Sequence, residues 1–91
     1  MKVYDLYNIV LSNERGKVDY IQHHFSKDDA IKSLRETYYE DLEQLERDDI
    51  SFEGDEDFEK ENNQFEYTIF YGPDCAFYRA EIVHSILKME E

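Results

Sequence analysis

Residues 27–47 read KDDAIKSLRETYYEDLEQLER, and the spacing of the apolar side chains in this stretch decides the fold. Those side chains recur after three, four, four and three positions, which is the period of an amphipathic helix packed on a sheet. They are Ile31, Leu34, Tyr38, Leu42 and Leu45. Ser26 is a favourable N-cap residue, and Asp29 three positions later completes a pair that resembles a capping box. The pattern predicts a helix from about Lys27 to Arg47.

Two hairpins are predicted on either side of this helix. Residues 3–11 (VYDLYNIVL) and 18–25 (VDYIQHHF) are rich in β-branched and aromatic side chains and flank a polar break that contains Gly16. Residues 64–71 (QFEYTIFY) and 75–87 (CAFYRAEIVHSIL) flank a Gly-Pro-Asp turn. We expect each pair of segments to form antiparallel strands.

Residues 48–63 (DDISFEGDEDFEKENN) break the helical rhythm, and we expect a long loop here, with room for a short helical turn at 55–60. The three glycines, Gly16, Gly54 and Gly72, are assigned to turns. The predicted fold is therefore α+β, a single domain over residues 1–91 in the order β-β-α-loop-β-β. In it, an antiparallel sheet carries one long helix on one face.

The composition is that of a folded domain, because 41% of the 91 residues are hydrophobic and 15% are aromatic. A single cysteine, Cys75, excludes an internal disulfide, and residues 1–10 lack the pattern of a secretory signal. We therefore expect a cytoplasmic protein. No apolar run reaches the length of a membrane helix, and the net charge of −13 opposes direct binding to anionic lipid or nucleic acid.

Negative charge is concentrated in residues 40–61, which contain twelve acids and two bases and so carry ten of the thirteen net negative charges. On the predicted helix the acids fall opposite the apolar stripe, and like charges three or four positions apart oppose helix formation by about 0.2–0.5 kcal/mol per pair. The acids also gather toward the carboxyl end, where the helix dipole favours cations. Such penalties favour a surface kept for a positively charged partner, while a solvated face that aids solubility is the alternative.

The residues predicted to bind this partner lie on the helix and in the segment that follows it. They are Glu36, Glu40, Glu43, Glu46, Asp48, Asp49, Glu53, Asp55, Glu56, Asp57, Glu59, Glu61 and Tyr39.

Metal, cofactor and catalytic sites are not expected. A calcium loop built around Gly54 would place Lys60 where a bidentate Glu is required, and the adjacent His23 and His24 would point to opposite faces of a strand. Cys75 has no adjacent His or Lys to activate it as a nucleophile. The chain has no glycine-rich phosphate loop, and acids on an exposed helix lack the apolar pocket that acid–base catalysis needs. We expect a binding protein and not an enzyme.

Eight tyrosines and no tryptophan form a second notable feature. Five of them are expected near the seam between helix and sheet: Tyr38, Tyr39, Tyr67, Tyr71 and Tyr78. Tyrosine is favoured in binding sites because it offers a large contact area with few rotatable bonds. The alternative is that most of these side chains belong to the core, with their hydroxyls at its rim.

The runs GDEDFEKE and YYEDLEQLE resemble the surfaces of small phage and mobile-element proteins that mimic DNA, among them anti-CRISPR and anti-restriction proteins. The resemblance covers mainly residues 36–61 and assigns no role to an individual residue. It implies an inhibitor in the host cytosol whose carboxylates replace phosphates in the basic groove of a nucleic-acid-binding protein, such as a CRISPR effector or a restriction nuclease. The chain also resembles the immunity proteins that neutralise nuclease toxins. A third reading is an adaptor that binds through a tyrosine-rich sheet.

Overall fold

A computed structural model describes residues 1–58, 65–74 and 76–90, and within these ranges the chain forms five strands and one helix. In chain order they are β1 (Lys2–Asn13), β2 (Val18–His24), α1 (Lys27–Arg47), β3 (Phe52–Asp57), β4 (Glu66–Tyr71) and β5 (Ala76–Met89). The α+β class with one long helix on an antiparallel sheet is confirmed, and the sheet has one strand more than predicted.

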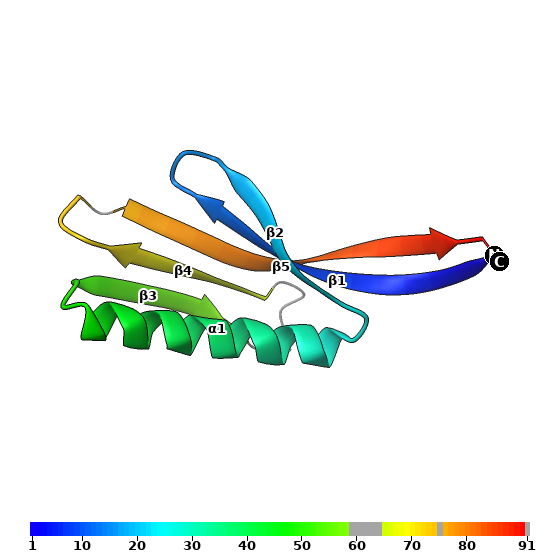
Figure 1. The fold of residues 1–91 in the computed structure, drawn as a ribbon, viewed down its shortest axis with the longest axis horizontal. Coiled ribbons are helices and arrows are strands. Elements are labelled where there is room, and N and C mark those ends of the chain that lie inside the picture. Colours follow the sequence, from blue (N-terminus) through cyan, green and yellow to red (C-terminus); the bar gives the residue numbers. More distant parts are fainter. Residues whose placement is uncertain (59–64, 75, 91) are drawn as a thin grey trace.

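The strands form one sheet in the order β2-β1-β5-β4-β3, with antiparallel neighbours throughout (Figure 1). Both predicted hairpins are present as β1–β2 and β4–β5. The two longest strands, β1 and β5, pair with each other along the middle of the sheet, from Lys2 opposite Met89 to Asn13 opposite Tyr78. This long-range pair joins the two hairpins into one sheet.

Helix α1 begins at the predicted N-cap and ends in a closure that the sequence pattern did not predict. The Ser26 hydroxyl accepts the backbone N–H of Asp29 at 3.3 Å, as an N-cap does. At the other end, Asp49 adopts a left-handed conformation with φ 58°, and the Ile50 N–H donates to the Leu45 carbonyl at 3.0 Å. Together with the Asp49 N–H bonded to the Glu46 carbonyl, this is a Schellman closure in which aspartate replaces the usual glycine.

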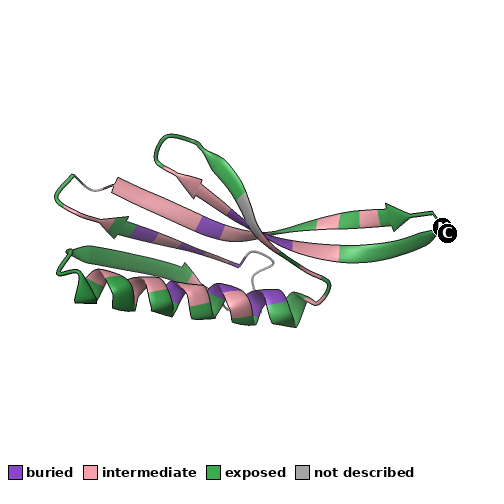
Figure 2. Ribbon diagram, viewed as in Figure 1, coloured by how far each residue is buried: buried purple, intermediate pink, exposed green. Residues whose placement is uncertain are grey.

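The core lies between α1 and one face of the sheet. Ile31, Leu34 and Tyr38 are buried there as predicted, while Leu42 and Leu45 pack at the margin. The sheet contributes buried side chains from β1, β4, β5 and the residue before β4: Ile9, Phe65, Tyr67, Ile69 and Ala80. Figure 2 shows that the buried positions are confined to the part of the sheet that α1 covers.

The prediction of a loop over residues 48–63 is wrong for residues 52–57, which form strand β3. β3 pairs with β4 from Phe52 opposite Tyr71 to Asp57 opposite Glu66. Four of its six residues are acids, but an edge strand can direct charged side chains to solvent, and its conformation is set by the ladder with β4. The helical turn at 55–60 is also wrong where it overlaps β3, and residues 59–60 lie outside the described ranges.

Gly54 is a strand residue, although the sequence predicts a turn. It lies beneath the ring of Tyr38, and a Cβ added at Gly54 would collide with the Tyr38 hydroxyl. The absence of a side chain therefore lets α1 approach β3 closely. Gly16 and Gly72 do occupy turns, each with a φ of 76° that favours glycine.

Beyond the part covered by α1, residues 2–6 of β1 and 85–89 of β5 pair only with each other among the described strands. We call this two-stranded extension the ribbon. It projects to the right of the body in Figure 1, and most of its residues are coloured as exposed in Figure 2. The ribbon makes the molecule elongated, with extents of 52 × 26 × 22 Å.

Candidate functional site

The acids of α1 form a row on its solvent side. Glu36, Glu40, Glu43 and Glu46 are all exposed, as the helical period predicts. At about 1.5 Å rise per residue the row extends for about 15 Å along the helix. One base interrupts it, because Arg47 lies 3.6 Å from the Glu43 carboxylate.

The row continues past the carboxyl end of the helix. Asp48 is the C-cap residue, and both its carboxylate oxygens accept the Gln44 side-chain amide, at 3.1 and 3.2 Å. Asp49 follows in the left-handed conformation that closes the helix. Both aspartates are exposed, so negative charge extends the row where the helix dipole is itself negative.

A second row of acids lies on the edge strand β3. The register with β4 places Gly54 opposite Ile69 and Glu56 opposite Tyr67, and these two β4 side chains point into the core. Gly54 and Glu56 therefore face α1. Because neighbouring strand residues alternate between faces, Glu53, Asp55 and Asp57 lie on the face of the sheet away from α1.

The predicted partner-binding residues are thus divided between two layers of the molecule. The helix row, which we define as Glu36, Glu40, Glu43, Glu46, Asp48 and Asp49, faces solvent on one side. The strand row, defined as Glu53, Asp55 and Asp57, faces the other side, and Glu56 lies between them. The predicted residues Glu59 and Glu61 lie outside the described ranges.

Asp41 belongs to the same acidic stretch but points the opposite way, into the helix–sheet seam. Its Oδ2 atom accepts the Tyr78 hydroxyl at 2.9 Å and the Tyr67 hydroxyl at 3.3 Å. Burial raises the pKa of both tyrosines well above the ordinary value, and the Asp41 carboxylate raises each pKa further. This acid holds the helix to the sheet and is not available to a partner.

The cations of the amino half of α1 also have structural roles that sequence reasoning missed. The Lys27 ammonium lies 5.2 Å from the centre of the Phe65 ring, and the Arg35 guanidinium lies 5.9 Å from that of Phe58. Such cation–aromatic contacts stabilise a fold by about 0.5–1 kcal/mol at exposed sites. These contacts supply a local reason for Lys27 and Arg35 in the amino half of α1, where the helix dipole alone would favour anions.

Arg35 also borders the strand side of the site. With Glu56, Asp57 and Phe58 it lines a depression of about 280 Å³ between α1 and the end of β3. A positive charge therefore stands near Glu56, which faces α1, and near Asp57 at the end of β3. The outward-facing Glu53 and Asp55 do not line this depression, so they are better placed to meet a cationic partner.

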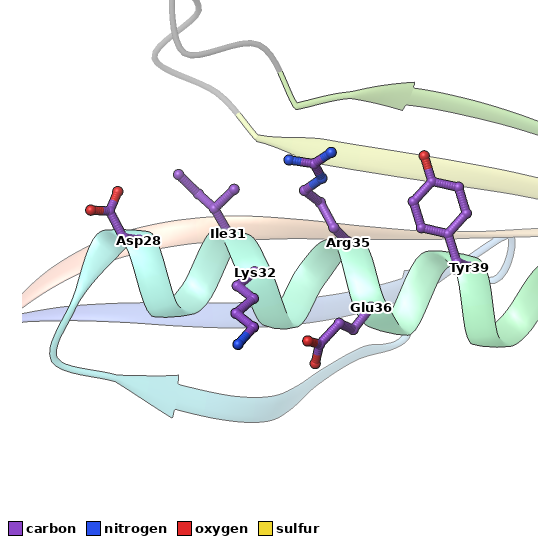
Figure 3. A pocket seen from close by; sticks show the side chains of 6 residues that line it. All are labelled: Asp28, Ile31, Lys32, Arg35, Glu36 and Tyr39. Atoms are coloured by element: carbon purple, nitrogen blue, oxygen red, sulfur yellow. The ribbon is translucent and has the colours of Figure 1, made fainter.

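Tyr39, the one predicted site residue that is not an acid, is exposed and borders an open depression of about 390 Å³ on α1. Figure 3 shows its ring on the same side of the helix as Ile31 and Arg35, with Lys32 and Glu36 directed to the other side. Its ring centre is 5.2 Å from that of Tyr38. Tyr39 thus adds an aromatic contact at the amino end of the helix row.

The other predicted seam tyrosines do lie between helix and sheet. Tyr38 and Tyr67 are buried, and their ring centres are 5.0 Å apart. Tyr78 packs between Tyr67 and Tyr71, with ring centres 6.4 and 5.8 Å away. These side chains are part of the core, which is the alternative that the sequence left open for the tyrosines. They do not form an open binding face.

Within residues 1–58, 65–74 and 76–90, no group of three or more His, Cys, Asp or Glu side chains is placed to hold a metal ion. No helix among the described residues is long and apolar enough to cross a membrane. The prediction for Cys75 falls on a residue outside those ranges.

Comparison of the chain with family models, curated proteins and solved structures gave no match.

Proposed function

We propose that this protein is an inhibitor that binds the basic nucleic-acid groove of a nuclease or another DNA-binding protein and competes with the nucleic acid. The observation that carries the proposal is the segregation of charge. Residues 36–57 contain eleven acids and one base, whereas residues 1–35 contain five acids and six bases. Within residues 36–57, ten acids were predicted to bind the partner. Nine of them are exposed, and Asp57 is half-buried.

The spacing of the helix row supports mimicry of phosphates. Its six acids span residues 36–49, a distance of about 20 Å at about 1.5 Å rise per residue. That gives one charge per about 3–4 Å, close to the one phosphate per about 3.4 Å along each strand of B-DNA. The strand row is sparser, with one acid per about 6.6 Å.

The division into two rows adds to this support. The two phosphate strands of a duplex run along opposite sides of a narrow body, and the helix row and strand row lie on opposite sides of a body 26 × 22 Å across. A cleft that encloses a duplex could then meet carboxylates on both walls. A flat basic surface could engage only one row.

A competition experiment tests the proposal. The immobilised protein is used to recover a nuclease from a bacterial lysate, and that nuclease is titrated with a fluorescently labelled DNA duplex at increasing concentrations of the protein. We expect the apparent Kd for DNA to rise in proportion to the protein added. A captured nuclease that binds DNA and this protein at the same time would overturn the proposal.

Two variants of equal net charge locate the contact. The patch variant carries Glu40→Gln, Glu43→Gln, Asp55→Asn and Asp57→Asn. The control variant carries Glu14→Gln, Asp19→Asn, Asp74→Asn and Glu90→Gln, at exposed positions outside both rows. We expect the patch variant to bind about tenfold or more weakly, mainly through slower and less salt-sensitive association, and the control to bind like the parent. Equal affinities for the two variants would contradict the proposed surface.

An immunity protein against a nuclease toxin would use the same acidic surface, and the competition experiment distinguishes it by the identity of the captured nuclease. The adaptor reading has less support. The tyrosines through which an adaptor would bind are largely enclosed between α1 and the sheet, and Tyr67 is only 1% exposed.

A further inference from the structure

Next to the strand row, two aromatic side chains of the sheet are left partly open to solvent. Phe70 of β4 and Phe77 of β5 lie opposite each other in the ladder, and their ring centres are 5.7 Å apart. Phe70 also lies opposite the exposed Glu53 of β3, so the three side chains form one line on the face of the sheet away from α1. Phe70 is 39% exposed. An aromatic surface therefore lies beside a solvent-exposed carboxylate.

An open depression of about 180 Å³ lies at this point, between the start of β3 and the end of β4. These strand ends are at the end of the molecule opposite the ribbon (Figure 1). The depression is lined by Ser51, Phe52, Glu53, Phe70, Tyr71 and Gly72. Three of these residues are aromatic, and Glu53 is the one that carries a charge. We call it the aromatic depression, and it combines apolar contact area with one negative charge.

Arg79 of β5 shows that the same face of the sheet accommodates a guanidinium. It lies two residues after Phe77, and its guanidinium bonds to the carboxylates of Glu66 and Glu81. Arg79 therefore neutralises those two acids. No described residue forms a hydrogen bond or an ion pair with the Glu53 side chain, so this carboxylate is available to a partner.

We propose that the aromatic depression binds an arginine side chain of the cationic partner, with the guanidinium against the Phe70 ring and hydrogen-bonded to the Glu53 carboxylate. The identity of the partner rests on the proposed function, and the depression adds which side chain of the partner is held and where. Charge supports this occupant, because the depression includes an acid of the strand row on a molecule of net charge −13. A second copy of the chain would instead bring a further charge of −13 to the same place.

Arginine suits these two contacts better than lysine. Its guanidinium is planar and weakly hydrated, so it can stack on an aromatic ring while its N–H groups bond to a carboxylate beside the ring. A lysine ammonium is compact and strongly hydrated, and it lacks the planar fork of donors. Directly opposed residues of an antiparallel pair have Cβ atoms about 4.5–5.5 Å apart, so one guanidinium can reach both Phe70 and Glu53. The depression therefore predicts a preference for arginine beyond that given by charge alone.

Two peptides of equal charge test this preference. Acetylated amides of tetra-arginine and tetra-lysine are titrated separately into the isotopically labelled full chain at about 0.15 M NaCl, and NMR chemical shifts give each Kd. We expect tetra-arginine to bind about two- to fivefold more tightly, with the largest shift changes at Glu53, Phe70 and Phe77. Equal affinities, or shift changes centred on the helix row, would overturn the inference.

Glu53→Gln and Asp55→Asn form a matched pair of variants. Both remove one negative charge from the same face of β3, but only Glu53 lines the aromatic depression. Asp55→Asn should weaken the binding of both peptides to a similar extent and so keep the preference for arginine. Glu53→Gln should reduce that preference to less than about twofold, because the guanidinium loses its carboxylate. Equal loss of the preference in the two variants would show that position within the strand row does not matter, and would overturn the inference.

The aromatic contact is tested by three substitutions. Phe70→Leu removes the ring and should abolish the preference, whereas Phe70→Tyr keeps a ring and should keep the preference. Phe25→Leu is the control, because Phe25 is 68% exposed and lies outside the depression. The melting curve of each variant verifies the fold, and if Phe70→Leu does not fold, the comparison of Glu53→Gln with Asp55→Asn decides. A preference that persists in folded Phe70→Leu would overturn the inference.

The peptide titrations and the competition with DNA can fail separately. A protein that competes with DNA but binds the two peptides equally would keep the proposed function and overturn the arginine site. A protein that prefers arginine at Phe70 but does not compete with DNA would support the site and overturn only the proposed function. Shifts at Phe70 that change with the concentration of the protein without peptide would place a second copy in the depression, and would also overturn the inference.

Discussion

At the scale of single residues, Asp41 differs most from the neighbouring acids, because it bonds to the core and they face solvent. It lies three positions after Tyr38 and four before Leu45, so helical spacing alone places it on the core side. The signal was present in the sequence, but the count of acids over residues 40–61 treated Asp41 like the rest. Its partners, the hydroxyls of Tyr67 and Tyr78, come from strands that only the fold brings together.

The raised pKa values of Tyr67 and Tyr78 predict a loss of stability at high pH. Both hydroxyls keep their protons in the folded state above pH 10, where the unfolded chain releases them, so the folded state binds more protons. Stability is therefore complete below about pH 10 and falls above it, by up to about 1.4 kcal/mol per pH unit for each tyrosine. Urea unfolding from pH 8 to 11.5 measures the slope.

Tyr78→Phe is the control for this pH dependence. It should lower the free energy of unfolding by about 1–2 kcal/mol at neutral pH, because Asp41 loses its shorter hydrogen bond. Above pH 10 the slope should become shallower than in the parent, because one titrating group is gone. An unchanged slope would mean that Tyr78 does not keep its proton in the folded chain.

At the scale of elements, the contact of β3 with α1 depends on Gly54. Gly54→Ala should destabilise the fold by about 1–3 kcal/mol, because the new methyl group overlaps the Tyr38 hydroxyl and the ring has little room to move. Adding Tyr38→Phe removes the nearest atom and should recover part of the loss. Denaturant unfolding of the two single variants and the double variant measures this coupling. Purely additive effects would contradict the close approach.

The elements differ in how well the sequence predicts them, and the reason is physical. The helix and four strands have apolar side chains at their own period, so α1, β1, β2, β4 and β5 could be identified from local pattern. β3 reads FEGDED and has a single large apolar residue, Phe52. Its extended conformation comes from hydrogen bonds to β4, which no local pattern encodes.

The sequence likewise predicted the part of the candidate site that lies on the helix, but not the part that lies on β3. The helical period placed Glu36, Glu40 and Glu43 opposite the core, and the structure exposes all three. With β3 taken as a loop, the sequence could not show that Glu53 and Asp55 face away from the helix row. Nor could it show that Arg35 borders Glu56, because that contact joins segments about 20 residues apart.

At the scale of the whole molecule, the acidic surface should make stability depend on salt. The excess of ten negative charges over residues 36–57 repels itself, and added ions screen this repulsion. We expect the free energy of unfolding to rise by about 1 kcal/mol between about 0.05 and 0.5 M NaCl. The patch variant should lose more of this salt dependence than the control variant of equal net charge. Equal losses would mean that total charge matters and its position does not.

Segregated charge on a body 52 Å long also gives the molecule a large electric dipole moment. The negative pole lies at the carboxyl half of α1 and at β3, and the ribbon points to the other pole, as the layout in Figure 1 indicates. In the field of a cationic protein the molecule would experience a torque that turns its acidic end forward before contact. At physiological ionic strength the field decays over about 8 Å, so this alignment would occur only in the last nanometre of approach.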